Sequence, residues 1–141
     1  MINFDVTNEL MCIARGRGRF YAKKGSMVAF KGDFRFEKLL LGPNNGGGLG
    51  GALLGHLQRK ITGENMPIMS VEGSGEVYLA ENAYHVDVIH LEPGDSINVE
   101  SENLLAFTEA LTYSTTFVGS GVISQRGLFS TYLKNNTNSV Q

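Results

Sequence analysis

The chain has 141 residues, 42% hydrophobic and 18% charged, so it is long and apolar enough to fold as one domain around a core. Its net charge of −2 lacks the basic surplus typical of a general nucleic-acid binder, and its single cysteine excludes an intrachain disulfide and a multi-cysteine zinc site within one chain. With neither a secretion signal at the start nor an apolar run near the roughly 20 residues of a spanning helix, we expect a cytoplasmic protein.

The N-terminal third carries a run of cations. An apolar run over residues 10–14 predicts a buried strand, in which Cys12 is a small buried hydrophobe. Alternate residues of a strand share a face, so three arginines separated by glycines would line one face: Arg15, Arg17 and Arg19. With Lys23 and Lys24 nearby, this face is a candidate for binding RNA or another anion. The alternative is a solvated strand face whose glycines mark a bulge.

The next segments are a pair of apolar stretches and a Gly-rich insertion. Residues 27–30 and 34–36 predict two strands, with a tight turn or a bulge at residues 31–33. Residues 42–60 predict an inserted Gly-rich loop with a short helix over residues 52–60. Its apolar residues stand beside two cations, so the loop is a candidate contact for a protein partner or a membrane surface through Leu49, Leu53 and Leu54. The alternative is a partly exposed apolar loop without a partner.

Residues 68–80 predict two short strands that meet at Gly73-Ser74-Gly75. A fainter copy spans residues 11–22, where Gly16 and Gly18 stand at a constant offset (73 − 16 = 57 and 75 − 18 = 57). Residues 103–113 likewise resemble residues 26–36 (107 − 30 = 77), and residues 126–133 resemble residues 64–71 (126 − 64 = 62). These similarities predict two β units with unequal loops. None of the Gly-x-Gly pairs continues into a dinucleotide-binding fingerprint, because the third glycine is missing.

Residues 84–100 predict a β-hairpin with a type II turn at Glu92-Pro93-Gly94-Asp95. On its first strand, His85 and Asp87 are two residues apart, so both could reach one metal ion, with Glu92 as a further ligand. The arrangement loosely resembles the first motif of cupins, but a cupin site also needs a later histidine, and none follows His90. The alternative is a surface His–Asp pair. The polar residues 135–141 predict a frayed tail.

The sequence points to no reaction. It has no Gly-x-Ser-x-Gly nucleophile elbow, Cys12 has no histidine near it in sequence, and nothing singles out a catalytic pair among the 14 acidic residues. We therefore expect neither catalytic residues nor a cofactor.

Seven short motifs together resemble a known family. They are residues 27–30, 46–55, 62–66, 73–79, 91–95, 104–107 and 126–129. In this order they resemble the family named for altered inheritance of mitochondria, number 24, over residues 10–133. The resemblance implies a fold similar to that of the tryptophan RNA-binding attenuation protein, a β-sandwich of double-stranded β-helix type built from internal repeats. It implies no catalytic residue, and typical members carry about one more repeat.

From these observations we expect residues 1–141 to form a single all-β domain, with the Gly-rich loop 42–60 inserted and a polar tail at 135–141. A missing repeat would leave an unpaired strand edge, which invites pairing with another subunit. We expect a non-enzymatic, homo-oligomeric binding or scaffold module. The alternatives are a cupin-like metal protein that uses His85 and Asp87, and an RNA or anion binder that uses the face from Arg15 to Lys24.

Overall fold

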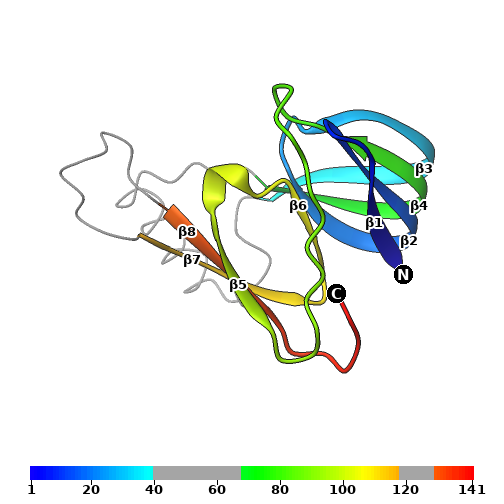
Figure 1. The fold of residues 1–141 in the computed structure, drawn as a ribbon. Helices are drawn as coiled ribbons and strands as arrows, with labels where there is room; N and C mark the ends of the chain where they lie inside the picture. The colour runs from blue at the N-terminus through cyan, green and yellow to red at the C-terminus, as the bar shows by residue number, and fades with distance from the viewer. Residues whose placement is uncertain (40–67, 118–128) are drawn as a thin grey trace.

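The computed structural model describes residues 1–39, 68–117 and 129–141 (Figure 1). Within these ranges the chain is all-β, as predicted, and its strands pair antiparallel. The helical content of the same ranges is one 3₁₀ turn, η1 (Ser101–Asn103), so no helix there is long and apolar enough to cross a membrane. The predicted Gly-rich loop and its short helix lie outside the described residues.

The larger sheet contains five strands: β1 (Ile2–Asn8), β2 (Met11–Lys23), β3 (Met27–Leu39), β4 (Ile68–Leu79) and β6 (Ala106–Thr108). Their order is β1-β2-β4-β3, and β6 pairs with β2 beyond the end of β1 (Figure 1). The two strands predicted at residues 27–30 and 34–36 are one continuous strand, β3. Its irregularity lies between Met27 and Ala29, not at residues 31–33, because Gly32 keeps its place in the ladder opposite Gly75.

Glycines lie opposite one another in the middle of this sheet. Gly75 of β4 lies between Gly16 of β2 and Gly32 of β3, and Gly73 lies opposite Gly18. Gly75 has a φ of +135°, and a Cβ there would come within 2.0 Å of a carbonyl oxygen of β3. Only glycine avoids both the strained backbone and this clash. The two Gly-x-Gly segments that resemble each other in sequence are thus antiparallel neighbours.

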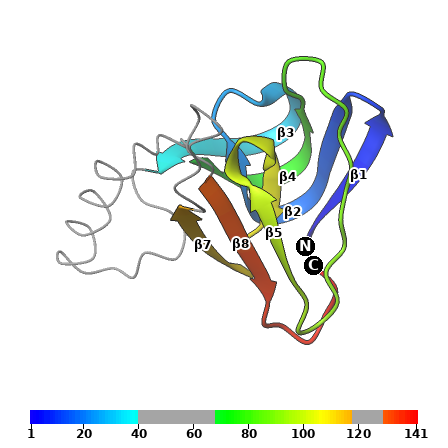
Figure 2. The same ribbon diagram turned by 60° about the vertical axis from the view of Figure 1, so that its left-hand side comes forward.

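The smaller sheet has the order β5-β8-β7 and consists of β5 (Ser96–Glu100), β8 (Phe129–Asn135) and β7 (Leu111–Phe117) (Figure 2). The predicted hairpin over residues 84–100 is wrong, because β5 pairs with β8 and residues 84–91 form no strand. The predicted type II turn is confirmed: the Asp95 amide donates to the Glu92 carbonyl over 2.9 Å, and Gly94 has a φ of +90°.

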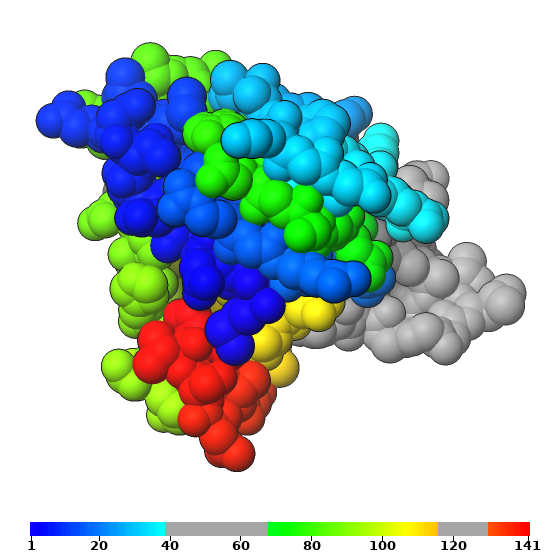
Figure 3. All heavy atoms as spheres, turned by 90° about the vertical axis from the view of Figure 1, so that its right-hand side faces the viewer, coloured from blue at the N-terminus to red at the C-terminus, as the bar shows by residue number. Residues whose placement is uncertain are grey.

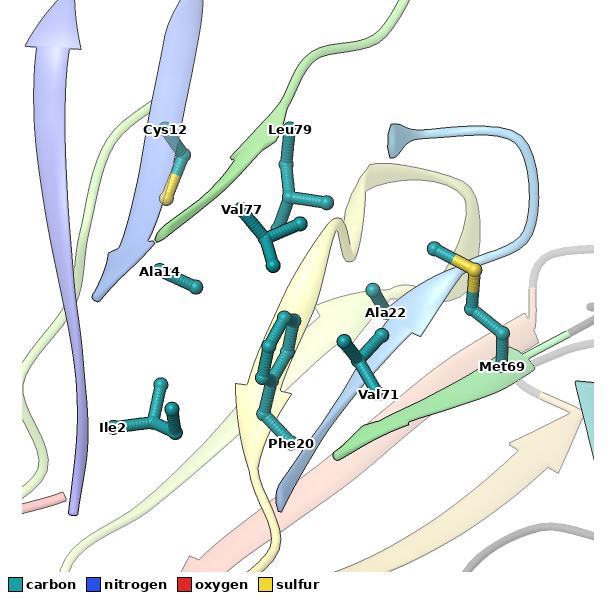
Figure 4. Close-up of a cluster of buried hydrophobic side chains, with 9 residues drawn as sticks. All are labelled: Ile2, Cys12, Ala14, Phe20, Ala22, Met69, Val71, Val77 and Leu79. Atoms are coloured by element: carbon teal, nitrogen blue, oxygen red, sulfur yellow. The ribbon is translucent and has the colours of Figure 1, made fainter. Parts of the chain in front are cut away.

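Two clusters of apolar side chains form the core. The first lies on the inner face of the larger sheet, and Figure 4 shows its members projecting from β1, β2 and β4: Ile2, Cys12, Ala14, Phe20, Ala22, Met69, Val71, Val77 and Leu79. The second joins the first residue of β4 to the smaller sheet and includes Ile68, Leu91, Leu104, Phe107, Leu111 and Leu133. Cys12 is 4% exposed, which confirms it as a small buried hydrophobe, and burial raises its pKa to about 11.

Residues 80–91 form a segment that we call the strap, which begins with a turn at Asn82 and Ala83 and continues without regular secondary structure (Figures 1 and 2). It leads from β4 to the turn before β5, and the Val86 amide donates to the Glu9 carbonyl over 2.9 Å. The C-terminal residues hold its far end, because Leu91 and Gln141 exchange two backbone hydrogen bonds, of 2.8 and 3.0 Å. Asn135, fully buried, also donates to the Leu91 carbonyl over 2.9 Å. The prediction of a frayed tail is therefore wrong.

Candidate interaction surface

The predicted arginine face exists on the outer side of the larger sheet. Arg15, Arg17 and Arg19 are exposed and alternate with glycines along β2. This side of the sheet faces the viewer in Figure 3, where β2, β4 and β3 are blue, green and cyan. The register places Glu76 of β4 opposite Arg15 and Glu72 opposite Arg19. Two of the three arginines therefore have a carboxylate as their cross-strand neighbour.

These neighbours form ion pairs. The Arg15 Nε donates to Glu76 over 2.9 Å, and an Arg19 Nη donates to Glu72 over 2.7 Å. The Arg19 hydrogen bond lowers the pKa of the Glu72 carboxyl. A hydrogen bond from the Tyr78 hydroxyl, followed by that from Arg15, lowers the pKa of the Glu76 carboxyl. Both carboxylates stay charged at neutral pH and offset the arginines beside them.

The charge of this whole face is balanced. On the outer side of β2, β3 and β4, together with Glu109, whose carboxylate lies 3.9 Å from Arg19, five exposed cations stand beside four exposed carboxylates and the half-buried Glu76. The cations are Arg15, Arg17, Arg19, Lys31 and Arg35, and the carboxylates are Asp33, Glu37, Glu72, Glu76 and Glu109. A nucleic-acid surface gains its affinity from a surplus of cations, so this balance does not favour the RNA alternative.

The inner face of β3 is aromatic and lies at the edge of the sheet. The rings of Phe30, Phe34 and Phe36 are 5.2 to 6.5 Å apart by their centroids. Phe34 and Phe36 pack against the first core cluster, whereas Phe30 is 47% and nearby Val28 57% exposed. β3 is the last strand in the order of its sheet, and no strand of the described ranges pairs with its outer edge. We call this strand margin the phenylalanine edge.

The residues of the metal alternative are not brought together. His85 is 80% exposed, and its Nε2 lies 4.0 Å from a carboxylate oxygen of Glu9. Asp87 accepts a hydrogen bond from the Val88 amide over 2.8 Å. The strap that carries both residues is not a strand, so their spacing does not aim them at one point. Among the residues that the structure describes, no three His, Cys, Asp or Glu side chains could hold a metal ion together.

The leucines of the predicted loop contact, Leu49, Leu53 and Leu54, lie outside the described residues. Contact with a protein partner or a membrane through this loop therefore stays a prediction.

A protein-family model identifies the family of the chain, which the geometry alone does not. Residues 8–139 match the model described as mitochondrial biogenesis AIM24. The chain belongs to this family. No curated protein matches the sequence.

A solved structure shares the fold of this AIM24-family chain. The crystal structure of the protein SPYM3_0169 from Streptococcus pyogenes is similar to it with a TM-score of 0.61 at 22% sequence identity. The similarity covers 96% of this chain and 60% of the Streptococcus pyogenes chain, so this chain spans about three fifths of that protein's length. At this level of identity the comparison concerns the fold alone.

Sequence reasoning missed the phenylalanine edge of this AIM24-family chain as a surface. It identified the strand residues around Phe30, Phe34 and Phe36 but not their position at a sheet margin. The available signal was three aromatic residues at even spacings of four and two residues, which place them on one face of a strand. Such a pattern indicates one apolar face. Whether that face is central or marginal depends on the order of strands, and β4 lies between β2 and β3 although it follows both in sequence.

Proposed function

We propose that this AIM24-family protein is a non-enzymatic binding module that assembles with a second copy of itself through β3. The observation that carries the proposal is the phenylalanine edge. Its outer margin has no partner strand in the described ranges, and Val28 and Phe30 are 57% and 47% exposed. A long apolar edge strand is a template for pairing with another chain, and twofold dimers are the commonest closed assembly.

The charges of β3 favour one register for such a pair. If two copies of β3 run antiparallel about Phe34, Lys31 lies opposite the partner's Glu37 and Asp33 lies opposite the partner's Arg35. Opposite charges directly across a pair of strands stabilise it. A register about Asp33 would instead set two aspartates against each other and Lys31 against the partner's Arg35. The alternation of charge therefore supports pairing about Phe34.

The aromatic residues support the same register. Phe34 would meet the partner's Phe34 on the inner face, and Phe36 would lie opposite the partner's Gly32, whose lack of a side chain leaves room for a ring. Phe30, 47% exposed in one chain, would then lie beside the apolar stem of the partner's Lys38.

The non-enzymatic part of the proposal is supported by the state of the reactive groups. Cys12 is buried and its pKa is raised to about 11, so at neutral pH it is a thiol and a poor nucleophile. Glu72 and Glu76 form ion pairs, and Tyr78 donates its hydroxyl to Glu76.

We also propose the finer fold implied by the resemblance, the double-stranded β-helix sandwich of the attenuation protein. Two antiparallel sheets, with almost no helix in the described ranges, support this proposal.

Light scattering on chromatographed protein tests the assembly. We expect twice the mass of the 15.3 kDa chain. The variant Asp33→Arg places an arginine opposite the partner's Arg35 and should raise the dissociation constant of the dimer about tenfold or more. The double variant Asp33→Arg/Arg35→Asp restores opposite charges across the interface and should recover the dimer.

The matched control places the same charge change on the other edge of the sheet. Asp5→Arg on β1, which is exposed, should leave the mass unchanged. A monomer at every concentration would refute assembly, and an oligomer indifferent to Asp33→Arg would refute the assignment to β3. Circular dichroism on each variant verifies that the fold is retained.

A further inference from the structure

A cavity of about 290 Å³ lies beneath the strap, where the two core clusters meet. The strap contributes Val86, Val88 and Leu91 to its wall, and β6 with its neighbours contributes Leu104, Leu105 and Phe107. Val86 and Val88 pack against the first cluster, whereas Leu91 and Phe107 belong to the second. The cavity is therefore the gap that the two clusters leave between them. None of the described side chains of β3 lines it, so it is separate from the proposed dimer contact.

The size and the walls of the cavity suit an apolar ligand. Protein interiors normally leave few voids larger than a water molecule, because side chains interdigitate. An apolar cavity of roughly 150 Å³ in another protein stays dry and binds benzene, and this one, at about 290 Å³, has nearly twice that volume. It has room for a body of about two fused rings. Cys12, which also lines it, presents a neutral thiol, since burial raises its pKa.

The polar groups around the cavity are mostly acidic. Among the described residues, its lining includes three acidic residues, Glu81, Asp87 and Glu102, and neither lysine nor arginine. Lys23 bonds the Glu81 carboxylate and the backbone carbonyl of Glu102, so it offsets the charge of Glu81. Asp87 and Glu102 form no ion pair with any described residue. The one basic residue in the described part of the lining, His85, lies 4.0 Å from the carboxylate of Glu9.

This charge pattern selects the head group of the ligand. Asp87 and Glu102, without an ion pair among the described residues, attract a cation and repel an anion at the mouth of an apolar cavity. The rings of Phe107 and Tyr84, which also line the cavity, favour a cation over an anion as well. We propose that the cavity binds a small hydrophobic amine, with an apolar body of about two rings between the clusters and a protonated amino group beside Asp87 and Glu102. This site goes beyond the proposed assembly function and does not depend on it.

Two probes with the same rings and opposite charge test the proposal. Isothermal titration at pH 7 would compare 1-naphthylmethylamine, which is a cation, with 1-naphthaleneacetate, which is an anion. We expect the amine to bind about tenfold or more tightly than the acid. Methyl resonances of Val86, Val88 and Leu105 should shift on addition of the amine, because these side chains line the cavity. Binding of neither probe, a preference for the acid, equal affinities, or shifts confined to other residues would each overturn the proposal.

A pair of neighbouring charge variants locates the selectivity. Glu102→Lys reverses one charge of the cavity lining and should lower the preference for the amine about tenfold. Glu100→Lys makes the same change at an exposed residue that does not line the cavity, and should leave the preference unaltered. Both residues are exposed, so both variants should fold. Equal effects of the two variants would overturn the assignment of Glu102 to the head group.

Discussion

Gly75 shows how a single residue fixes the shape of the larger sheet. Backbone of β2 and of β3 passes on either side of it, and its φ of +135° is one that side chains rarely permit. We predict that Gly75→Ala lowers the free energy of unfolding by about 3 kcal/mol, through backbone strain and a clash with the carbonyl oxygen of Lys31. Chemical denaturation monitored by circular dichroism measures the change.

The control for this prediction is another glycine with a positive φ. Gly25 has a φ of +85°, but a Cβ there would meet nothing within 4 Å. Gly25→Ala therefore carries the backbone strain without the clash and should cost about 1 kcal/mol. Equal losses in the two variants would show that the close approach of β3 to Gly75 contributes nothing to stability.

For single residues, the sequence predicts which side chains share a face of their own strand, but not which residues lie opposite them on the next strand. The alternation of Arg15, Arg17 and Arg19 with glycine correctly predicted a shared, exposed face. It did not predict that Glu72 and Glu76 would neutralise two of them. That contact depends on the register between β2 and β4, whose paired residues are 53 and 61 positions apart in sequence. Local periodicity holds no information on such a register.

The same limit appears among whole elements. The apolar run at residues 84–91 was predicted to be a strand, but Val86 and Val88 pack against the first core cluster from a strap that has no ladder. Alternating burial requires only an extended chain over a core, and a strand requires a partner as well. The turn at residues 92–95 was predicted correctly because its geometry depends on its own proline and glycine.

Asn135 joins three elements at the end of β8. Its amide nitrogen donates to the carbonyls of Leu91 and Ser139, over 2.9 and 2.7 Å, and its Oδ1 accepts from the amide of Thr137 over 2.9 Å. We predict that Asn135→Ala lowers the free energy of unfolding by about 3 kcal/mol, because it removes the hydrogen bonds of a fully buried side chain and leaves a cavity in its place. Hydrogen exchange at the Leu91 amide should also become faster, since the strap loses its anchor.

The adjacent residue provides the control for that prediction. Asn136 is exposed and bonds only the Thr112 hydroxyl, over 3.2 Å, among the described residues. Asn136→Ala should change stability by less than about 0.5 kcal/mol. If Asn135→Ala were as mild, the strap would be held by its packing against the core and not by the hydrogen bonds of the tail.

At the scale of the whole molecule, two incomplete features have different consequences. The core is divided into two clusters with a cavity between them, and the larger sheet ends in an apolar strand. A ligand in the cavity would join the clusters within one chain, whereas a second copy at β3 would bury apolar surface between chains. The ligand and the second copy would each bind only the folded state, and so each would stabilise it by mass action. Only the second makes stability depend on the concentration of the protein itself.

This difference leads to a prediction for thermal unfolding. If two copies pair through β3, unfolding also dissociates them, so the midpoint temperature should rise with protein concentration. For a chain of 141 residues we expect a rise of about 2 °C for each tenfold increase in concentration. The Asp33→Arg variant, which disfavours pairing, should lose this dependence, whereas Asp5→Arg on the opposite edge should retain it. Calorimetry over a hundredfold range of concentration measures the slope, and a flat line for the unmodified protein would mean that β3 remains an open edge in solution.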